Sequence, residues 1–84
     1  MAKTFDEVLR EVTGIFREVL NKEAIQLKRE TTAAEIPEWD SLTHVELVVA
    51  VEKHFGIRFN FVELQKFKNV GEWCDNIVGK LAAK

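Results

Sequence analysis

The first regular pattern of apolar residues covers residues 5–20, where apolar side chains return every three or four positions. This spacing predicts a helix with one buried face. Thr4 and Glu7 fit a capping box at its start, in which each side chain accepts a hydrogen bond from a backbone N–H that the helix leaves unpaired. Gly14 lies inside the helix and costs about 1 kcal/mol relative to alanine; close packing against a neighbour would account for it. The apolar positions are Phe5, Val8, Leu9, Val12, Ile15, Phe16, Val19 and Leu20.

Residues 21–40 lack such a pattern and form a long connection. Pro37 argues against a continuous helix here, because proline has no N–H group and disfavours helical geometry in the residue before it. We expect the connection to be held on the core by its large apolar side chains. These are Ile25, Leu27, Ile36 and Trp39.

A second main helix is predicted over residues 41–55. Asp40 is a favourable N-cap residue, because its short carboxylate can accept hydrogen bonds from the first N–H groups of the helix. Gly56 suits the left-handed position after the last turn, and Ile57 would complete a Schellman motif. Both ends of this helix can therefore be read from local sequence.

Two further helices follow. Asn60 with Glu63 predicts the start of a short third helix, and Asn69 with Glu72 predicts the start of a fourth. The sequence therefore predicts an all-α fold, a small four-helix bundle of three main helices plus a short third helix, with a long loop between helices 1 and 2. The buried stripe of the fourth helix is expected to be Val70, Trp73, Cys74, Ile77 and Leu81.

The helix over residues 41–55 has apolar residues on two sides. Leu42, Val45 and Val49 form one stripe, with Glu46 beside it, roughly opposite the core-facing side. Either the helix is buried all round, or this stripe is an exposed surface that docks partners. We favour the exposed stripe, because a domain of this size has little material with which to cover both sides. The core-facing set is His44, Leu47, Val48, Val51 and Phe55.

Composition limits the class of protein. With 84 residues, the chain forms one domain covering residues 1–84. The content of 46% hydrophobic and 31% charged residues is that of an ordered globular domain. A net charge of −2 argues against a general nucleic-acid binder. Cys74 is the single cysteine, so no internal disulfide is implied. We expect a cytoplasmic protein without membrane insertion, since neither a signal peptide nor a spanning apolar run is evident.

Charge is distributed unevenly. The interval from Glu30 to Glu52 holds six acidic residues and no lysine or arginine. From Lys53 to Lys68 the balance reverses. The modest net charge therefore conceals an acidic surface around residue 41, which would attract basic partners.

Asp40, Ser41 and Leu42 stand where the irregular connection gives way to the second main helix. A serine at a helix N-terminus lies beside unpaired N–H groups and the positive end of the helix dipole, which both favour a phosphate. Ser41 is therefore a suitable attachment point for a phosphate-bearing group.

At these residues the chain resembles the acyl carrier protein family over nearly its full length. The resemblance covers the amphipathic first helix, the long loop, Asp-Ser-Leu at residues 40–42, the run at residues 45–52 and Phe-Gly-Ile at residues 55–57. It implies that a phosphopantetheinyl transferase moves 4′-phosphopantetheine from coenzyme A, with Mg²⁺, onto the Ser41 hydroxyl. The arm would carry acyl groups as thioesters to partner enzymes, and the protein itself would not be an enzyme.

The resemblance also implies a recognition surface and a set of partners. Asp40, Leu42, Val45, Glu46 and Val49 occupy the positions of the family's recognition helix. The implied partners, besides the transferase, are acyl-ligating, acyltransferase or synthase enzymes of a fatty-acid, lipid or polyketide-like pathway, and a monomer is expected.

The chain also departs from the family pattern. Trp39 stands where a small residue is common, and Thr43 and His44 follow the motif where many members have an acid. The segment is more similar to carrier proteins of specialised pathways than to those of housekeeping fatty-acid synthesis.

Other functions fit the same residues less well. Ser41 and His44, with Asp40, could be read as a hydrolase site, but one helix end supplies no oxyanion hole or substrate pocket. Asp40 and Ser41 could simply cap the helix. Metal binding is not expected, because His44 and His54 lie on different faces and Cys74 has no nearby ligand. An aminoacyl or peptidyl carrier serving an adenylating enzyme, and an unmodified helical interaction module, remain alternatives.

Overall fold

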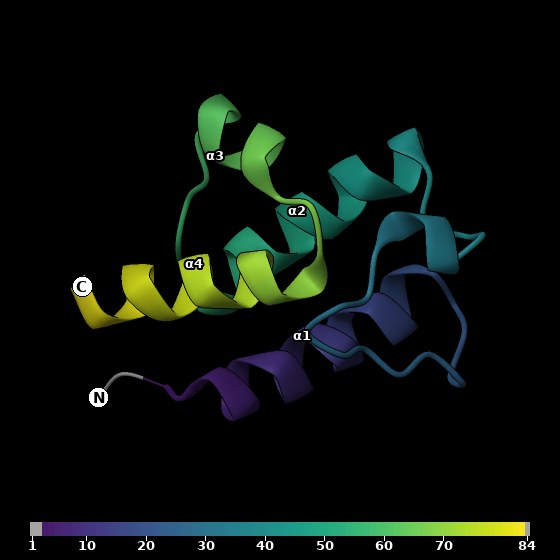
Figure 1. The fold of residues 1–84 in the computed structure, drawn as a ribbon, viewed down its shortest axis with the longest axis horizontal. Coiled ribbons are helices and arrows are strands. Elements are labelled where there is room, and N and C mark those ends of the chain that lie inside the picture. The colour runs from purple at the N-terminus through teal and green to yellow at the C-terminus, as the bar shows by residue number, and fades with distance from the viewer. Residues whose placement is uncertain (1–2, 84) are drawn as a thin grey trace.

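The computed structural model describes residues 3–83, and the regular structure in that range is helical throughout (Figure 1). The all-α, four-helix prediction is confirmed. The first helix ends one residue earlier than predicted, with Leu20 as its C-cap. The elements are α1 (Phe5–Val19), a 3₁₀ turn η1 (Ala33–Glu35), α2 (Ser41–Phe55), α3 (Phe61–Lys66) and α4 (Val70–Ala83).

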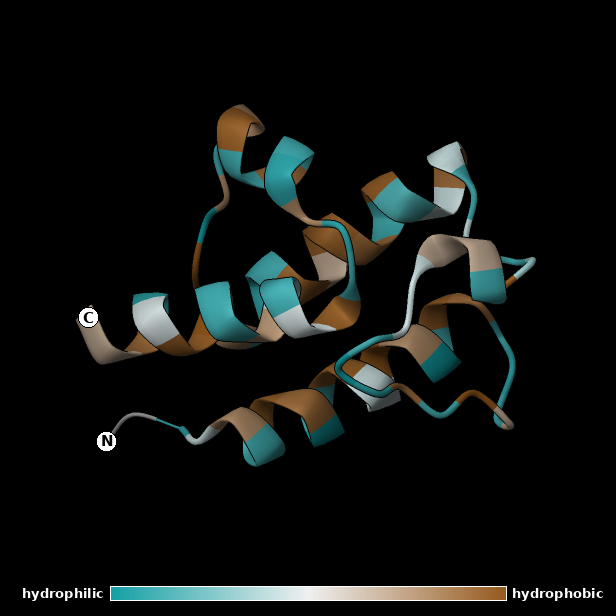
Figure 2. Ribbon diagram, viewed as in Figure 1, coloured by the Kyte–Doolittle hydropathy of each residue, from teal (hydrophilic) through white to brown (hydrophobic). Residues whose placement is uncertain are grey.

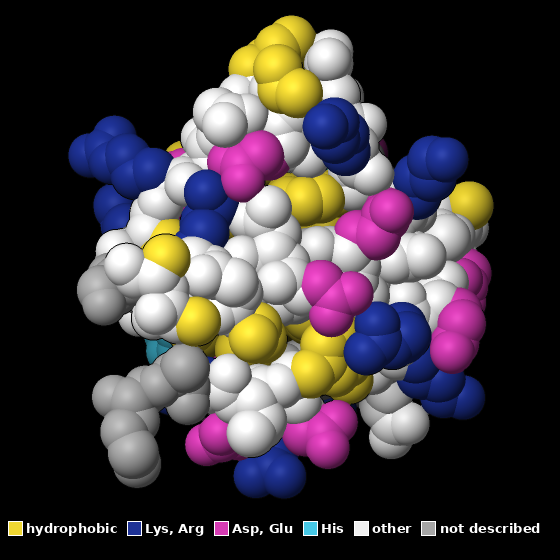
Figure 3. Space-filling model, turned by 60° about the vertical axis from the view of Figure 1, so that its left-hand side comes forward, with side chains coloured by type: hydrophobic (Ala, Val, Ile, Leu, Met, Phe, Trp, Pro, Cys, Tyr) yellow, Lys and Arg dark blue, Asp and Glu magenta, His cyan; other side chains and the backbone are white. Residues whose placement is uncertain are grey.

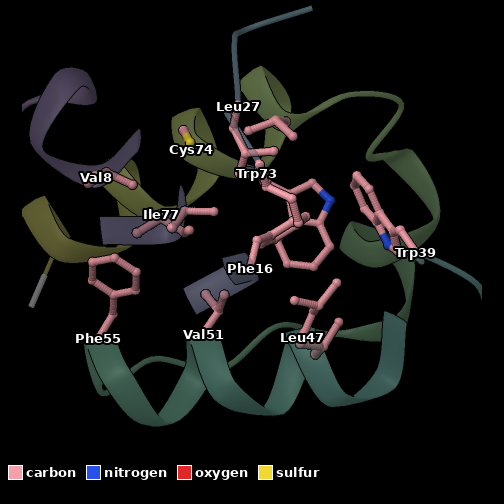
Figure 4. Packing of buried hydrophobic residues seen from close by; sticks show 14 of the residues in the cluster. Val8, Phe16, Leu27, Trp39, Leu47, Val51, Phe55, Trp73, Cys74 and Ile77 are labelled. Atoms are coloured by element: carbon pink, nitrogen blue, oxygen red, sulfur yellow. The ribbon is translucent and has the colours of Figure 1, made fainter. Parts of the chain in front are cut away.

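The main helices pack through α1, which lies against both α2 and α4. The short helix α3 stands away from this trio, above α2 and α4 in the view of Figure 1. Figure 2 shows both hydrophobic and hydrophilic residues on each main helix, with a continuous hydrophobic stretch in the middle of α2. Figure 4 shows Leu47 and Val51 pointing from α2 towards Phe16 and Trp73, and Phe55 pointing into the core on the side of Val8 and Ile77.

The caps of α1 and α2 follow the sequence prediction. The Thr4 N–H donates to the Glu7 carboxylate at 2.9 Å, and the Glu7 N–H donates to the Thr4 hydroxyl at 3.2 Å. At the end of α2, Gly56 has a left-handed φ of 65°. The Ile57 N–H donates to the Glu52 carbonyl at 3.1 Å, which completes the predicted Schellman motif.

The short helix α3 has the predicted reciprocal cap between Asn60 and Glu63, with hydrogen bonds of 2.9 and 2.8 Å. At α4 the prediction is only half correct. The Glu72 N–H donates to the Asn69 side chain at 3.0 Å, but the Glu72 carboxylate accepts its hydrogen bond from the Lys68 N–H and not from the Asn69 N–H. The carboxylate reaches one residue further back, so the box is not reciprocal.

The connection between α1 and α2 also caps α4. The Val70 N–H donates to the Thr31 carbonyl at 2.8 Å, and the Gly71 N–H donates to the Arg29 carbonyl at 2.9 Å. A Cβ atom at Gly71 would lie 2.5 Å from Cγ of Arg29 and 2.9 Å from its carbonyl oxygen. Glycine is therefore required for the connection to approach the start of α4.

The predictions for the connection and for Gly14 have opposite outcomes. Ile25, Leu27, Ile36 and Trp39 are all buried, so the connection is anchored as predicted. The close-packing explanation for Gly14 is wrong, because no atom outside its own helical surroundings lies within 4 Å of where a Cβ would be and the residue faces solvent. Within the described chain, no helix is long and apolar enough to cross a membrane.

Candidate functional site

Ser41 is the first residue of α2 and is exposed. Asp40 precedes it in an extended conformation, and its carboxylate accepts hydrogen bonds from the N–H groups of Leu42 and Thr43, both at 3.0 Å. The expectation that N–H groups here are unpaired is therefore wrong for these two, because Asp40 is a short N-cap residue that reaches both. A phosphate on Ser41 would gain from the helix dipole, but not from these two donors.

Thr43 fixes the turn that presents Ser41. Its hydroxyl accepts from the Asp40 N–H at 2.8 Å and lies 2.8 Å from the Glu38 carbonyl, to which it can donate. The N–H of Thr43, together with that of Leu42 and the Thr43 hydroxyl, lowers the pKa of Asp40 below its ordinary value. Asp40 therefore stays ionised beside Ser41 at neutral pH.

Trp39 and His44 form a pair beneath this turn. The Trp39 Nε1–H donates to His44 Nδ1 at 3.1 Å, and the two ring planes are nearly parallel, with an interplanar angle of 12°. Burial lowers the pKa of His44, so its ring is held in the neutral form that this bond requires. The pair was not predicted, although Trp39 and His44 occupy the two positions that form a staple across a helix N-cap.

This geometry weighs against the hydrolase interpretation. The ring of His44 is engaged with Trp39, and it also contacts Trp73 edge to face at 5.5 Å. Within residues 3–83, no hydrogen bond joins His44 to Ser41. The prediction that Trp39 and Trp73 are anchors is confirmed, since they are 8% and 1% exposed.

The two sides of α2 differ as the exposed-stripe interpretation predicts. Leu42, Val45 and Val49 are 79%, 60% and 41% exposed, whereas Leu47 and Val51 are fully buried. A helix buried all round is therefore excluded. We call Leu42, Val45 and Val49 the outer strip.

A second exposed apolar pair, Phe61 and Val62, lies on α3. In Figure 3 hydrophobic side chains gather at the top of the molecule, where α3 stands. This pair was not among the predicted site residues. The short helix carries too few residues for periodicity to assign its faces.

Among the acidic residues on either side of Ser41, Glu38 is offset by a lysine, whereas Glu52 is hydrogen-bonded but keeps its charge. Lys22 pairs with Glu38 at 3.2 Å, and the Glu52 carboxylate accepts from the Phe59 N–H at 2.8 Å. Asp40 and Glu46 remain exposed at the first half of α2.

Neither a metal centre nor a reactive thiol is apparent among residues 3–83. This range has no group of three or more histidine, cysteine, aspartate or glutamate side chains that could hold a metal ion. Cys74 is fully buried, as predicted, and burial raises the pKa of its thiol to about 12. Its role is in packing.

The chain is similar to known proteins over most of its length. A family model described as "Phosphopantetheine attachment site" matches residues 10–77. The acyl carrier protein of Thermosynechococcus vestitus is 35% identical over 77 residues, covering 92% of this chain and 95% of that protein. The acyl carrier protein of Acidothermus cellulolyticus is 34% identical over 77 residues, covering 92% of each chain.

A solved structure is also similar. It is the solution NMR structure of a holo acyl carrier protein from Geobacter metallireducens, with 47% sequence identity and a TM-score of 0.87. The match covers 90% of this chain and 87% of that one.

Proposed function

We propose, from the premise that this chain belongs to the acyl carrier protein family, that Ser41 bears its covalent 4′-phosphopantetheine group. Membership of the family makes the protein a carrier of acyl groups, held as thioesters on the phosphopantetheine arm, and not an enzyme. It also implies interaction with transferases and with synthase or acyltransferase enzymes in general.

The observation that carries the assignment is that Ser41 is the only serine in the chain. It lies within the matched residues 10–77, is exposed, and is held at the start of α2 by the Asp40–Thr43 cap. The group would reach it from coenzyme A, with Mg²⁺, through a phosphopantetheinyl transferase. A fixed helix end beneath a flexible arm gives the cargo mobility while the protein surface stays constant for partners.

We also propose that partners recognise the outer strip together with Asp40 and Glu46. The strip is apolar, exposed and adjacent to Ser41, and acids flank it. An apolar centre with a charged rim is the usual composition of a protein–protein interface. Burial of its side chains would contribute affinity, and the acids would speed the approach of basic partners.

The cellular role that we propose is a monomeric cytoplasmic carrier of a specialised lipid, fatty-acid or polyketide-like pathway. The segment 39–44 supports a specialised role, because Trp39, Thr43 and His44 are the residue types at which the resemblance to the family departs from its usual pattern. The relatives are acyl carrier proteins, which supports acyl cargo over aminoacyl cargo.

The test is intact mass after incubation with a broad-specificity phosphopantetheinyl transferase, coenzyme A and Mg²⁺. We expect the wild-type protein to gain one phosphopantetheine and Ser41→Ala to gain none. Thr13→Ala is the matched control, since it also removes a hydroxyl, and it should be modified like the wild type. A folded wild-type protein that gains no mass would overturn the proposal and leave an unmodified helical interaction module.

A further inference from the structure

We infer that enzymes docking on α2 meet it with charges of both signs, a cation against Asp40 and Glu46 and a carboxylate against Lys53 and Arg58. This inference rests on the proposed function, because it concerns the enzymes that reach Ser41. The acidic start of α2 already implies a basic group on the partner. The inference adds a carboxylate on the partner at the other end of the helix.

The register of α2 places Lys53 at the end of the outer strip. Val49 follows Leu42 by seven residues and Lys53 follows Val49 by four, so the three share one face of the helix. Lys53 is exposed. The face turned towards partners therefore runs from an acidic start through an apolar centre to a cationic end.

The cationic end is also hollowed. A groove of about 420 Å³ opens beside the last turn of α2. Val49 and Ile57 supply apolar surface, and Lys53 and Arg58 supply the cationic groups. The lining residues are Val49, Glu52, Lys53, Gly56, Ile57 and Arg58.

The two cations of this groove have no ion pair among residues 3–83, whereas Lys3, Lys22 and Lys80 are each paired with a glutamate. The one acid in the lining, Glu52, is bound to the Phe59 N–H at 2.8 Å. A carboxylate from a partner would thus meet an ammonium and a guanidinium group together, and the guanidinium favours carboxylates through paired N–H donors.

The separation of the two charged ends of α2 determines the direction in which a partner can bind the helix. Ser41 and Lys53 are about 18 Å apart along the helix axis, at a rise of 1.5 Å per residue. A partner that engaged α2 in the reverse direction would bring like charges together, which is costly. The arrangement therefore selects the orientation that brings Ser41 to the partner's catalytic centre.

The test compares the rates at which the wild-type chain and its variants are phosphopantetheinylated. We expect the double variant K53E/R58E to lower kcat/KM of the transferase by about tenfold at low salt, mainly through KM, and the difference to shrink as salt is raised. The matched control is R10E/K28E, which makes the same change in net charge at exposed residues of α1 and the long connection. It should change the rate less than twofold. Circular dichroism and the melting temperature of each variant establish that it is folded.

The outcomes separate the two proposals. If the wild type is modified at Ser41 but K53E/R58E reacts like the wild type, or if R10E/K28E loses as much, the inference of a two-sign surface is overturned and Ser41 stands. If K53E/R58E is unfolded, K53Q/R58Q is measured instead, with an expected loss of about threefold, and no loss overturns the inference. If the folded wild type is not modified, both proposals fail.

Discussion

The two faces of α2 are built from the same kinds of residue but have opposite environments. Leu47 and Val51 are fully buried, while Leu42 and Val45 are 79% and 60% exposed on the other side of the same helix. The difference comes from neighbours, since α1 packs against α2 and the outer strip stays exposed. Apolar composition alone therefore does not determine burial in this helix, and the uncovered face is available for binding.

The largest expected effect comes from truncating one leucine on each face. Leu47→Ala should lower the free energy of unfolding by about 2–5 kcal/mol, because it opens a cavity in a fully packed core. Leu42→Ala should change it by less than about 0.5 kcal/mol, because the side chain is already in water. Urea denaturation followed by circular dichroism measures both. Equal losses would mean that the outer strip is buried in solution.

Two glycines on other helices show the same difference between a buried and an exposed position, with smaller expected effects. Gly71→Ala should destabilise the protein by about 1–3 kcal/mol, because the new methyl group would strike Arg29 where the long connection caps α4. Gly14→Ala, which meets nothing within 4 Å, should stabilise it by about 0.5–1 kcal/mol through helix propensity. Thermal melts of the two variants test this pair. A stabilising Gly71→Ala would disprove the close approach of the connection to α4.

The smallest expected effect concerns His44, which lies on the core-facing side of α2 against Trp39 and Trp73. Burial lowers its pKa below 6.5 in the folded state, so the unfolded chain takes up a proton more readily. This contribution to stability is complete above pH 6.5 and falls as the pH drops through 6.5 towards the folded-state pKa. Denaturation midpoints between pH 7.5 and 5.5 should decline more in the wild type than in His44→Gln. Parallel profiles would show that His44 is not protected from protonation.

Short-range features of this chain could be predicted well from sequence. The Thr4–Glu7 and Asn60–Glu63 caps and the Gly56 turn depend on residues within a few positions of each other, so residue type and spacing decide them. The exposure of the outer strip needed one further argument, the limited covering capacity of a small domain. This argument gave the correct result because chain length limits how much surface a small domain can cover.

Features that depend on tertiary distance could not be predicted. The hydrogen bond from Gly71 to Arg29 joins residues 42 positions apart, and no local pattern indicates which glycine receives a close neighbour. The same limit explains the error at Gly14. At the site, the sequence predicted Asp40 as the N-cap, and its carboxylate does accept hydrogen bonds from the N–H groups of Leu42 and Thr43. The hydrogen bond between Trp39 and His44 was not predicted.

The burial of Trp39 and Trp73 side by side has a practical consequence. The chain contains two tryptophans and no tyrosine, so its near-ultraviolet emission comes from Trp39 and Trp73 alone. Their rings lie 6.1 Å apart, one on the segment leading to Ser41 and the other on α4. An enzyme or cargo that separated the start of α2 from α4 would admit water to both indoles and shift their emission to the red. The protein thus carries an intrinsic optical reporter of its own opening, which needs no added label.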